Sequence, residues 1–436
     1  MRNLSLLFLL FSCSQLLNAQ KVLFEEYDLA NGLHVILHQD KTAPLIVTSV
    51  LYHVGAKNEE KGRTGFAHFF EHLLFEGTEN IERGEWSKLV NSNGGRNNAY
   101  TNDDFTYYYE IFPSNNLELS LWMESERMLH PVINEIGVET QNEVVKEEKR
   151  LRYDNSPYGK WIFEVRKRMF DKHPYSHLPI GEMEHLDAAT LEEFIAFNKK
   201  YYVPNNAVLV IAGDFEIQAA KKMIADYFNE IPKGEAIVYE KIKETSITEP
   251  RTAEAFDKNI QIPALFTAYM IPEKTSRESF VFNMISSYLS DGNSSKLYRK
   301  LVDEKKMSLQ VAAFNMSMED YGLYVILSLP LGETELLAIR DEIDKEVEKI
   351  QTDLISEKDY QKLLNKFESD FVDSNRSIEG IANSLAEYYA IHGDTNLINS
   401  EIDIYRSITR EEIRDVANKY LNPNQRLTLN YLPEPN

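Results

Sequence analysis

A run of apolar residues predicts a buried helix near residue 70, with very few polar positions inside it. Thr64 is placed to cap the start of this helix, and Gly77 is placed to end it. The apolar side chains that wrap the helix are Phe66, Ala67, Phe69, Phe70, Leu73, Leu74 and Phe75. The polar exceptions are His68, Glu71 and His72. Ionisable groups are rarely buried without a partner, so the pattern implies that something satisfies these three side chains.

Elsewhere the chain alternates short strand-like segments with longer helical stretches. Residues 33–37, 46–52 and 321–329 have the β-branched and aromatic composition of strands. Runs of this kind between helical stretches are typical of an α+β fold with a mainly antiparallel sheet and helices packed on it.

A motif that begins with Thr-x-Glu-Glu and ends with Tyr-x-x-Pro-Asn occurs twice. The segment from Thr190 to Asn205 matches the segment from Thr409 to Asn424, at an offset of 409 − 190 = 219 residues. Both copies run into β-rich segments, 207–211 and 427–432. An internal duplication explains this best, so we predict two homologous α/β-sandwich domains.

The length also favours two domains. Removal of a leader of 19 residues would leave 436 − 19 = 417 residues, more than one hydrophobic core usually serves. We expect a first domain at 20–235 and a second at 259–436. The charged stretch between them, punctuated by proline from Pro232 to about Lys258, is the expected linker, with bounds of 236–258.

The spacing of His68 and His72 indicates a metal site. Residues four apart on a helix lie about 5 to 6 Å apart on one face, so both imidazoles can reach one ion. Glu71 lies close enough to that face to reach a water on the metal. Two His and a nearby acid fit a catalytic zinc, which takes three protein ligands. A metal-buffering protein is an alternative, but it would need no Glu71.

The third ligand must come from elsewhere, and the helix predicted over 139–151 offers acids. Its periodicity places Gln141, Val144, Glu148 and Leu151 on one inward stripe. Glu148 is therefore the candidate ligand, and Glu147, on the charged side, is the second choice.

When Gly77 is aligned with Gly292, the predicted metal helix of the first repeat aligns with residues 282–288 of the second repeat. His68, Glu71 and His72 then correspond to Asn283, Ser286 and Ser287. The second half has lost the metal groups, and we expect it to supply a wall or a lid.

Composition and the amino terminus point to an exported protein. The sequence starts with Met1-Arg2-Asn3, continues with an apolar run over 4–11 and reaches a small-residue exit at Ala19, as secretory signal peptides do. The single cysteine, Cys13, follows Phe11, which fits a lipoprotein cleavage box poorly, so a lipid anchor is the less favoured alternative. We expect a periplasmic or secreted protein with no transmembrane segment. The net charge of −22 argues against a nucleic-acid partner.

These motifs resemble the pitrilysin/insulinase family of zinc metallopeptidases, in the two-domain form of the bacterial processing peptidases. The inverted motif His-x-x-Glu-His, the flanks at 62–68 and 75–78, and the segments 94–107, 144–148 and 292–295 all look like the family's. The resemblance implies zinc ligands His68, His72 and Glu148, and Glu71 as general base. It implies a zinc-dependent endopeptidase that hydrolyses unfolded peptides or small polypeptides, with a fold that forms half of a clamshell chamber. A non-catalytic scaffold or peptide-binding subunit is the alternative.

The family pattern also implies a substrate strand and shows one departure. Peptide would lie as an added strand beside the edge formed by Asn98, Ala99, Tyr100 and Thr101. Seven residues before the distal ligand many members have an acid, whereas Gln141 stands here, next to the ligands rather than on the metal. This departure bears on rate and pH optimum more than on the reaction.

A partner chain is expected, because single-chain relatives of this family build the chamber from four such domains. Those relatives carry an Arg and a Tyr for the oxyanion in their last domain, where this chain has Val302 and Leu309. We therefore expect a dimer with a zinc-less homologous subunit, with a homodimer as the runner-up.

Two further histidine pairs have the four-residue spacing. His173 and His177 flank prolines and are interpreted as structural residues of a loop. His34 and His38 fall in a strand pattern and are interpreted as surface residues.

Overall fold

The computed structural model describes residues 21–435, so the predicted leader and Cys13 lie outside the described residues. The first half contains six strands: β1 (Glu25–Asp28), β2 (His34–Gln39), β3 (Leu45–Tyr52), β4 (Arg96–Thr101), β5 (Thr106–Pro113) and β6 (Ala207–Gly213). Its α-helices are α2 (Phe66–Leu73), α3 (Trp86–Ser92), α4 (Leu117–Leu129), α5 (Glu135–Lys149), α6 (Trp161–Met169), α7 (Met183–Asp187), α8 (Leu191–Tyr201) and α9 (Ile217–Phe228). A π-helix, η3 (Arg150–Asp154), continues α5.

The second half contains five strands: β7 (Arg251–Asp257), β8 (Ala264–Ile271), β9 (Ser308–Ser317), β10 (Gly322–Pro330) and β11 (Arg426–Pro433). Its helices are α10 (Arg277–Ser290), α11 (Leu336–Thr352), α12 (Glu357–Ser374), α13 (Ile378–Glu387), α14 (Leu397–Ser407) and α15 (Arg410–Tyr420). The π-helix η7 (Tyr388–His392) follows α13.

The two sheets have the same strand order. The first is β1-β2-β6-β3-β5-β4 and the second is β7-β11-β8-β10-β9, so β2, β6, β3, β5 and β4 correspond in turn to β7, β11, β8, β10 and β9. One parallel pair occurs in each sheet, β2 with β6 and β7 with β11, and the other pairs are antiparallel. The expected α+β fold with two homologous sandwich domains is therefore confirmed.

The repeated motif forms the same local structure in both halves. Thr190 and Thr409 each cap a helix, α8 and α15, by accepting a hydrogen bond from the backbone N–H three residues on. Each helix is followed by a short 3-10 turn that begins with proline, and then by β6 or β11.

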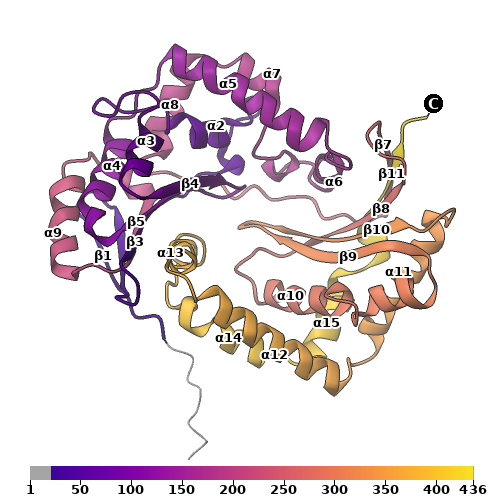
Figure 1. The fold of residues 1–436 in the computed structure, drawn as a ribbon. Helices are drawn as coiled ribbons and strands as arrows, with labels where there is room; N and C mark the ends of the chain where they lie inside the picture. Colours follow the sequence, from indigo (N-terminus) through magenta and orange to yellow (C-terminus); the bar gives the residue numbers. More distant parts are fainter. Residues whose placement is uncertain (1–20, 436) are drawn as a thin grey trace, which may run out of the picture.

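Each half covers a face of the other half's sheet. Helix α13 of the second half packs apolar residues such as Ile381 and Leu385 against β3 and β6. Helix α6 of the first half packs Val165 and Met169 against the second sheet. Figure 1 shows α13 lying between the first sheet and α14, with α6 above the strands of the second sheet. The two repeats therefore share apolar cores and are held as one unit.

Two expectations about the fold were wrong in detail. Residues 232–250 contain no helix or strand, but β7 occupies 251–257, so the linker ends near residue 250 rather than 258. His34 and His38 are buried rather than on the surface. The ring of His34 stacks on Tyr389 with centroids 3.5 Å apart, because α13 and η7 cover this face of the first sheet.

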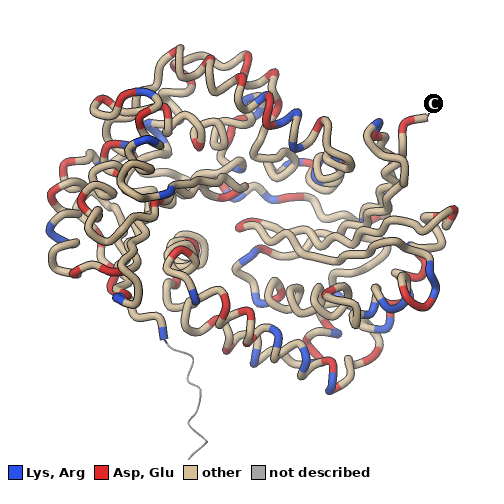
Figure 2. Tube along the Cα trace, in the orientation of Figure 1, with Lys and Arg blue, Asp and Glu red and all other residues tan. Residues whose placement is uncertain are grey.

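Charged residues lie mainly on the outer helices. Figure 2 shows Lys and Arg interspersed with Asp and Glu along α11 and α12, while the strands of the second sheet are largely uncharged. Among residues 21–435, no helix has the length and apolarity needed to cross a membrane.

Candidate metal centre

Helix α2 is buried as predicted, but its start is held in a different way. Gly65 occupies the N-cap position with φ 94°, and Thr64 makes no cap; its hydroxyl instead contacts His185 and accepts from the Glu182 N–H. The carboxylate of Glu59 accepts from the N–H groups of Gly65 and Ala67, at 2.8 and 2.9 Å. A carboxylate from outside the helix therefore replaces the expected cap.

The structure brings the three predicted ligands together. His68, His72 and Glu148 each offer a ligand atom, and these atoms all lie within 4.8 Å of one another. Glu148 Oε2 lies 3.2 Å from His72 Nε2 and 3.6 Å from His68 Nε2. Donors about 2.0 to 2.1 Å from one tetrahedral ion would lie roughly 3.3 Å apart, so the spacing fits zinc.

The Nε2 atoms of His68 and His72 both face Oε2 of Glu148. The described part of the chain supplies no hydrogen-bond partner for the buried Nδ1 of His68. Burial raises the pKa of the Glu148 carboxyl, but the hydrogen bonds and charges of His68 and His72 outweigh this effect, and the net pKa is lowered. Two imidazoles and one carboxylate are a donor set that catalytic zinc takes.

The structure places Glu148 beside His68 and His72, but the stripe from which it was chosen was partly wrong. Val144 and Leu151 are exposed, whereas Val145 is fully buried against the core of the first half. Glu148 faces α2 with Val145, while Glu147 is exposed and pairs with Arg150 at 3.1 Å. The helix contacts that fix this face come from α2, which the sequence of α5 alone does not reveal.

Gln141 does not contact the ligands directly. Its side-chain amide donates to Glu76, which also pairs with Arg83. The other oxygen of Glu148 is held by Arg152, at 2.9 Å. Arg152 was missed, although an ion pair at i and i+4 could have been found from the spacing.

Glu71 belongs to α2 and lies between His68 and His72 in the sequence. Within residues 21–435, its carboxylate has no hydrogen-bond partner. Its charge lies near the buried hydroxyls of Tyr108 and Tyr202, since it contributes to the raised pKa of each after burial and other neighbours. These two hydroxyls donate to the backbone carbonyls of Phe70 and Ala67, both in α2.

The predicted substrate strand is an edge strand. Asn98, Ala99, Tyr100 and Thr101 all lie in β4, the last strand of the first sheet, which pairs with β5 alone among the described strands. Helix α2 contacts β4, so the metal ligands lie beside this edge. The Tyr100 hydroxyl donates to Asn383 of α13, at 2.6 Å.

The remaining histidine motif is structural, as interpreted. His173 is buried and lies 3.4 Å from Asp320, and His177 lies 2.9 Å from the Glu59 carboxylate that caps α2. His177 therefore braces the metal helix without contacting a ligand.

The second half has no equivalent site among its described residues. Asn283 donates to the Tyr405 hydroxyl at 2.7 Å, and Ser286 donates to the Phe282 carbonyl of its own helix. The group of three potential ligands found in the described part of the chain is the one in the first half.

Comparison with known proteins agrees with this division. The family described as insulinase (peptidase family M16) matches residues 34–172, which hold all three ligands and Glu71. The family described as the peptidase M16 inactive domain matches residues 188–367, which hold none of them.

Relatives align over nearly the whole chain. The zinc protease PqqE of Helicobacter pylori is 30% identical over 93% of this chain and 92% of its own length. The crystal structure of a protease from Helicobacter pylori has a TM-score of 0.90 and 29% identity, covering 95% of this chain and all of that one. The periplasmic protease PqqL of Escherichia coli shares the fold, with a TM-score of 0.77 and 18% identity, covering 94% of this chain and 47% of its own. The chain belongs to the insulinase family of peptidases, M16.

Proposed function

We propose that this chain is a zinc-dependent endopeptidase that hydrolyses unfolded peptides or small polypeptides. The observation that carries the proposal is the convergence of His68, His72 and Glu148 beside the edge strand β4. A scaffold or a peptide-binding subunit would need neither this donor set nor Glu71.

The residues of the chain divide the chemistry among them. His68 Nε2, His72 Nε2 and Glu148 Oε2 would hold the zinc ion. When bound, zinc lowers the pKa of a coordinated water and polarises the scissile carbonyl. The carboxylate of Glu71 accepts a proton from the attacking water and returns it to the leaving amine. Arg152 holds the second oxygen of Glu148 and so fixes the orientation of that ligand.

Substrate capture relies on the backbone of β4. Its outer edge is not paired with any described strand, so an extended peptide can add to it by main-chain hydrogen bonds. Such binding demands an extended substrate and little of its side chains, which favours unfolded peptides over folded proteins. Asn98, Ala99, Tyr100 and Thr101 are the residues proposed to contact the substrate.

The decisive test separates metal binding from proton transfer. Glu71→Gln should retain about one zinc per chain and lose peptidase activity by about 1000-fold or more, since it removes the general base. His72→Ala should lose both zinc and activity. Zinc content by atomic spectroscopy and hydrolysis of an unfolded peptide are the measurements. If Glu71→Gln were as depleted of zinc as His72→Ala, the assignment of roles would be wrong.

The proposal includes a partner chain. This chain matches about half of the E. coli relative PqqL, so it supplies two of the domains that such a protein holds in one chain. Neither Val302, which packs beside the second core, nor the exposed Leu309 offers a donor for an oxyanion. We therefore favour a heterodimer with a zinc-less homologue, followed by a homodimer. Peptidase activity measured across a size-exclusion profile tests this: full turnover by a strict monomer would exclude both.

Export to the periplasm or the medium completes the proposal. The amino-terminal sequence supports it, and a relative of the same fold is titled a periplasmic protease. Amino-terminal sequencing of the protein from a periplasmic fraction should begin at Gln20; a start at Met1 would contradict the proposal.

A further inference from the structure

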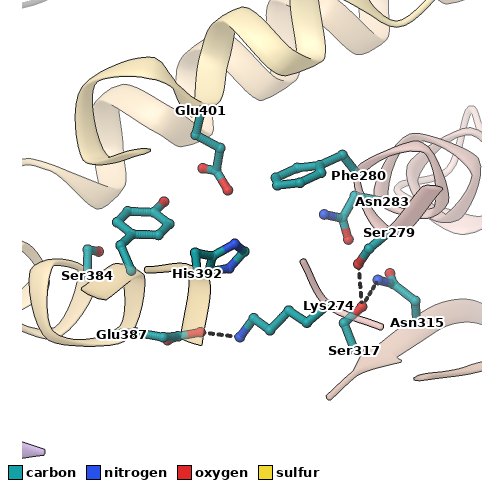
Figure 3. A pocket seen from close by; sticks show the side chains of 11 residues that line it. Lys274, Ser279, Phe280, Asn283, Asn315, Ser317, Ser384, Glu387, His392 and Glu401 are labelled. Carbon is teal, nitrogen blue, oxygen red and sulfur yellow. Dashed lines mark hydrogen bonds and ion pairs between the residues drawn. The ribbon is translucent and has the colours of Figure 1, made fainter. Parts of the chain in front are cut away.

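A polar cavity of about 380 Å³ lies in the second half, away from the metal ligands. It is enclosed by α10, α13, η7, α14 and the end of β9 (Figure 3). Its volume lies within the range of small-ligand sites. Its wall includes Ser384 and Glu387 of α13, the helix that contacts the proposed substrate strand through Asn383.

Most polar groups of the cavity wall are already paired. Ser317 accepts from the amide of Asn315 at 2.8 Å and contacts Ser279 at 2.9 Å. Lys274 forms an ion pair with Glu387. Figure 3 shows these contacts at one end of the cavity, with Glu401 reaching in from the opposite side toward His392 and Asn283.

Glu401 differs from Glu387 because its carboxylate forms no ion pair with any described residue, and the Tyr388 hydroxyl is its hydrogen-bond donor. Counting Lys274 as +1 and the two carboxylates as −1 each, the cavity carries a net charge of −1 with His392 neutral. Burial raises the pKa of Glu401, and the Glu387 charge adds to this, while Tyr388 and Lys274 oppose it. A bound cation would offset the cost of keeping this carboxylate ionised.

The groups that face the open space favour a cation with N–H donors. Glu401 and the side-chain carbonyl of Asn283 are acceptors, and burial with the charge of Lys274 lowers the pKa of His392 and keeps it neutral. Phe280 and Tyr388 supply apolar wall suited to the alkyl stem of a lysine. A metal ion is not favoured, since no three ligand atoms gather here in the described part of the chain.

The cavity shares helix α13 with the proposed substrate strand. Asn383 accepts from Tyr100 of β4 at 2.6 Å, and Arg96 of β4 pairs with Glu379 at 2.6 Å. Ser384 and Glu387, one and four residues after Asn383, line the cavity.

We propose that this cavity binds a primary ammonium group of the peptide that lies along β4, with Glu401 as its counter-ion. The inference rests on the proposed function, because it assigns a subsite to the same substrate. Two sources carry this chemistry, a lysine side chain and the amino terminus of the peptide.

The test uses neutral, unfolded peptides with a single lysine moved one residue at a time, each matched to a norleucine peptide. Both series are made with free and acetylated amino termini. For the wild-type chain we expect at least one lysine position, or the free terminus, to raise kcat/KM about 10-fold over its neutral match. In Glu401→Gln this ratio should fall to near one, and in Glu401→Asp it should be partly kept. Asp403→Asn, which removes an exposed charge from the same helix, should keep the full ratio.

Binding by the zinc-loaded Glu71→Gln chain, measured by calorimetry, separates this inference from the proposed function. If the chain preferred to bind the ammonium peptides but the wild type showed no turnover, the ammonium site would stand and the proposed peptidase activity would be refuted. Turnover with equal ratios in the wild type and in Glu401→Gln would refute the cavity. Dependence on lysine alone or on the free terminus alone would identify the source of the ammonium group.

Discussion

Helices α2 and α10 occupy equivalent places in the two repeats, yet they treat their polar residues in opposite ways. In α10, Asn283 and Ser286 find hydrogen-bond partners within the second half. In α2, the ring nitrogens of His68 and His72 converge on Glu148, and the buried Nδ1 of His68 has no partner among the described residues. The comparison teaches that a duplicated helix can be kept for packing, while the copy that could carry chemistry directs its polar side chains to one point.

The layers behind the two helices differ as well. Behind α2, Arg127 is fully buried, pairs with Glu110 and Glu124 at 2.8 and 3.1 Å, and donates to the Leu74 carbonyl at the end of the helix. In α11, at the offset of 219 residues, Ile343 replaces Glu124, and Glu346 stands in place of Arg127. The first half therefore fixes its metal helix with a buried ionic network around Arg127, whereas the second half has no cation at that position and pairs Asp344 of α11 with the buried Arg426 of β11.

The largest effect is expected from substitution of equivalent residues in the two helices. His68→Ala should abolish zinc retention, while Asn283→Ala should leave about one zinc per chain, because only the first half gathers a zinc donor set. Zinc per chain by atomic spectroscopy after gel filtration is the measurement. A second zinc per wild-type chain, lost in Asn283→Ala, would break the comparison.

The next prediction concerns the helix face that supplies the third ligand. Glu148→Gln should weaken zinc binding by more than the roughly 10- to 100-fold that loss of an outer-shell partner costs. Glu147→Gln, which removes a charge from the exposed face, should retain zinc. Competition with a chelator of known affinity measures both. The reverse order would mean that α5 presents the other face to α2.

Removal of the buried guanidinium should cost stability rather than metal ligands. Arg127→Ala leaves two buried carboxylates without their cation, and breaking a buried ionic network costs about 3–5 kcal/mol. Glu346→Ala, its counterpart in the second half, breaks a pair with the exposed Lys349 and should cost about 1 kcal/mol or less. Unfolding by urea, followed by circular dichroism, measures both. Equal losses would show that the two layers are energetically alike.

The features that sequence reasoning found are those whose signals are local. The spacing of His68 and His72 depends on residues within one turn, so their placement on one face follows from helix geometry. The repeat that begins at Thr190 and Thr409 is visible in the residues themselves. The burial of His34 and His38 was missed because the element that covers them, α13, is some 350 residues away in the chain.

The start of α2 shows the same limit at the site itself. Ser276, the local cap of α10, lies directly before its helix, where sequence rules look for it. The cap of α2 comes from Glu59, six residues before Gly65, and is braced by His177 from a distant loop. Val144 and Val145 could not be ranked from the periodicity of α5, because the tilt of that helix on α2 decides which one is buried.

The smallest predicted effect is a difference in pH dependence between the cap of α2, Glu59 braced by His177, and the cap of α10, Ser276. Burial lowers the pKa of His177, but its hydrogen bond to Glu59 and the charge of that carboxylate outweigh burial, and the net pKa is raised. A raised pKa means that the stabilisation is complete below about pH 6.5, the ordinary value, and is lost as the pH rises through the folded-state value. His177→Gln should therefore lower the free energy of unfolding by roughly 1–3 kcal/mol at pH 6 and by less at pH 9.

Ser276→Ala, which removes the uncharged cap of α10, should cost about 1 kcal/mol at both values. Urea unfolding of both variants and the wild type at the two pH values provides the measurement. A loss in His177→Gln that did not depend on pH would show that His177 braces α2 by packing alone, as an uncharged residue could.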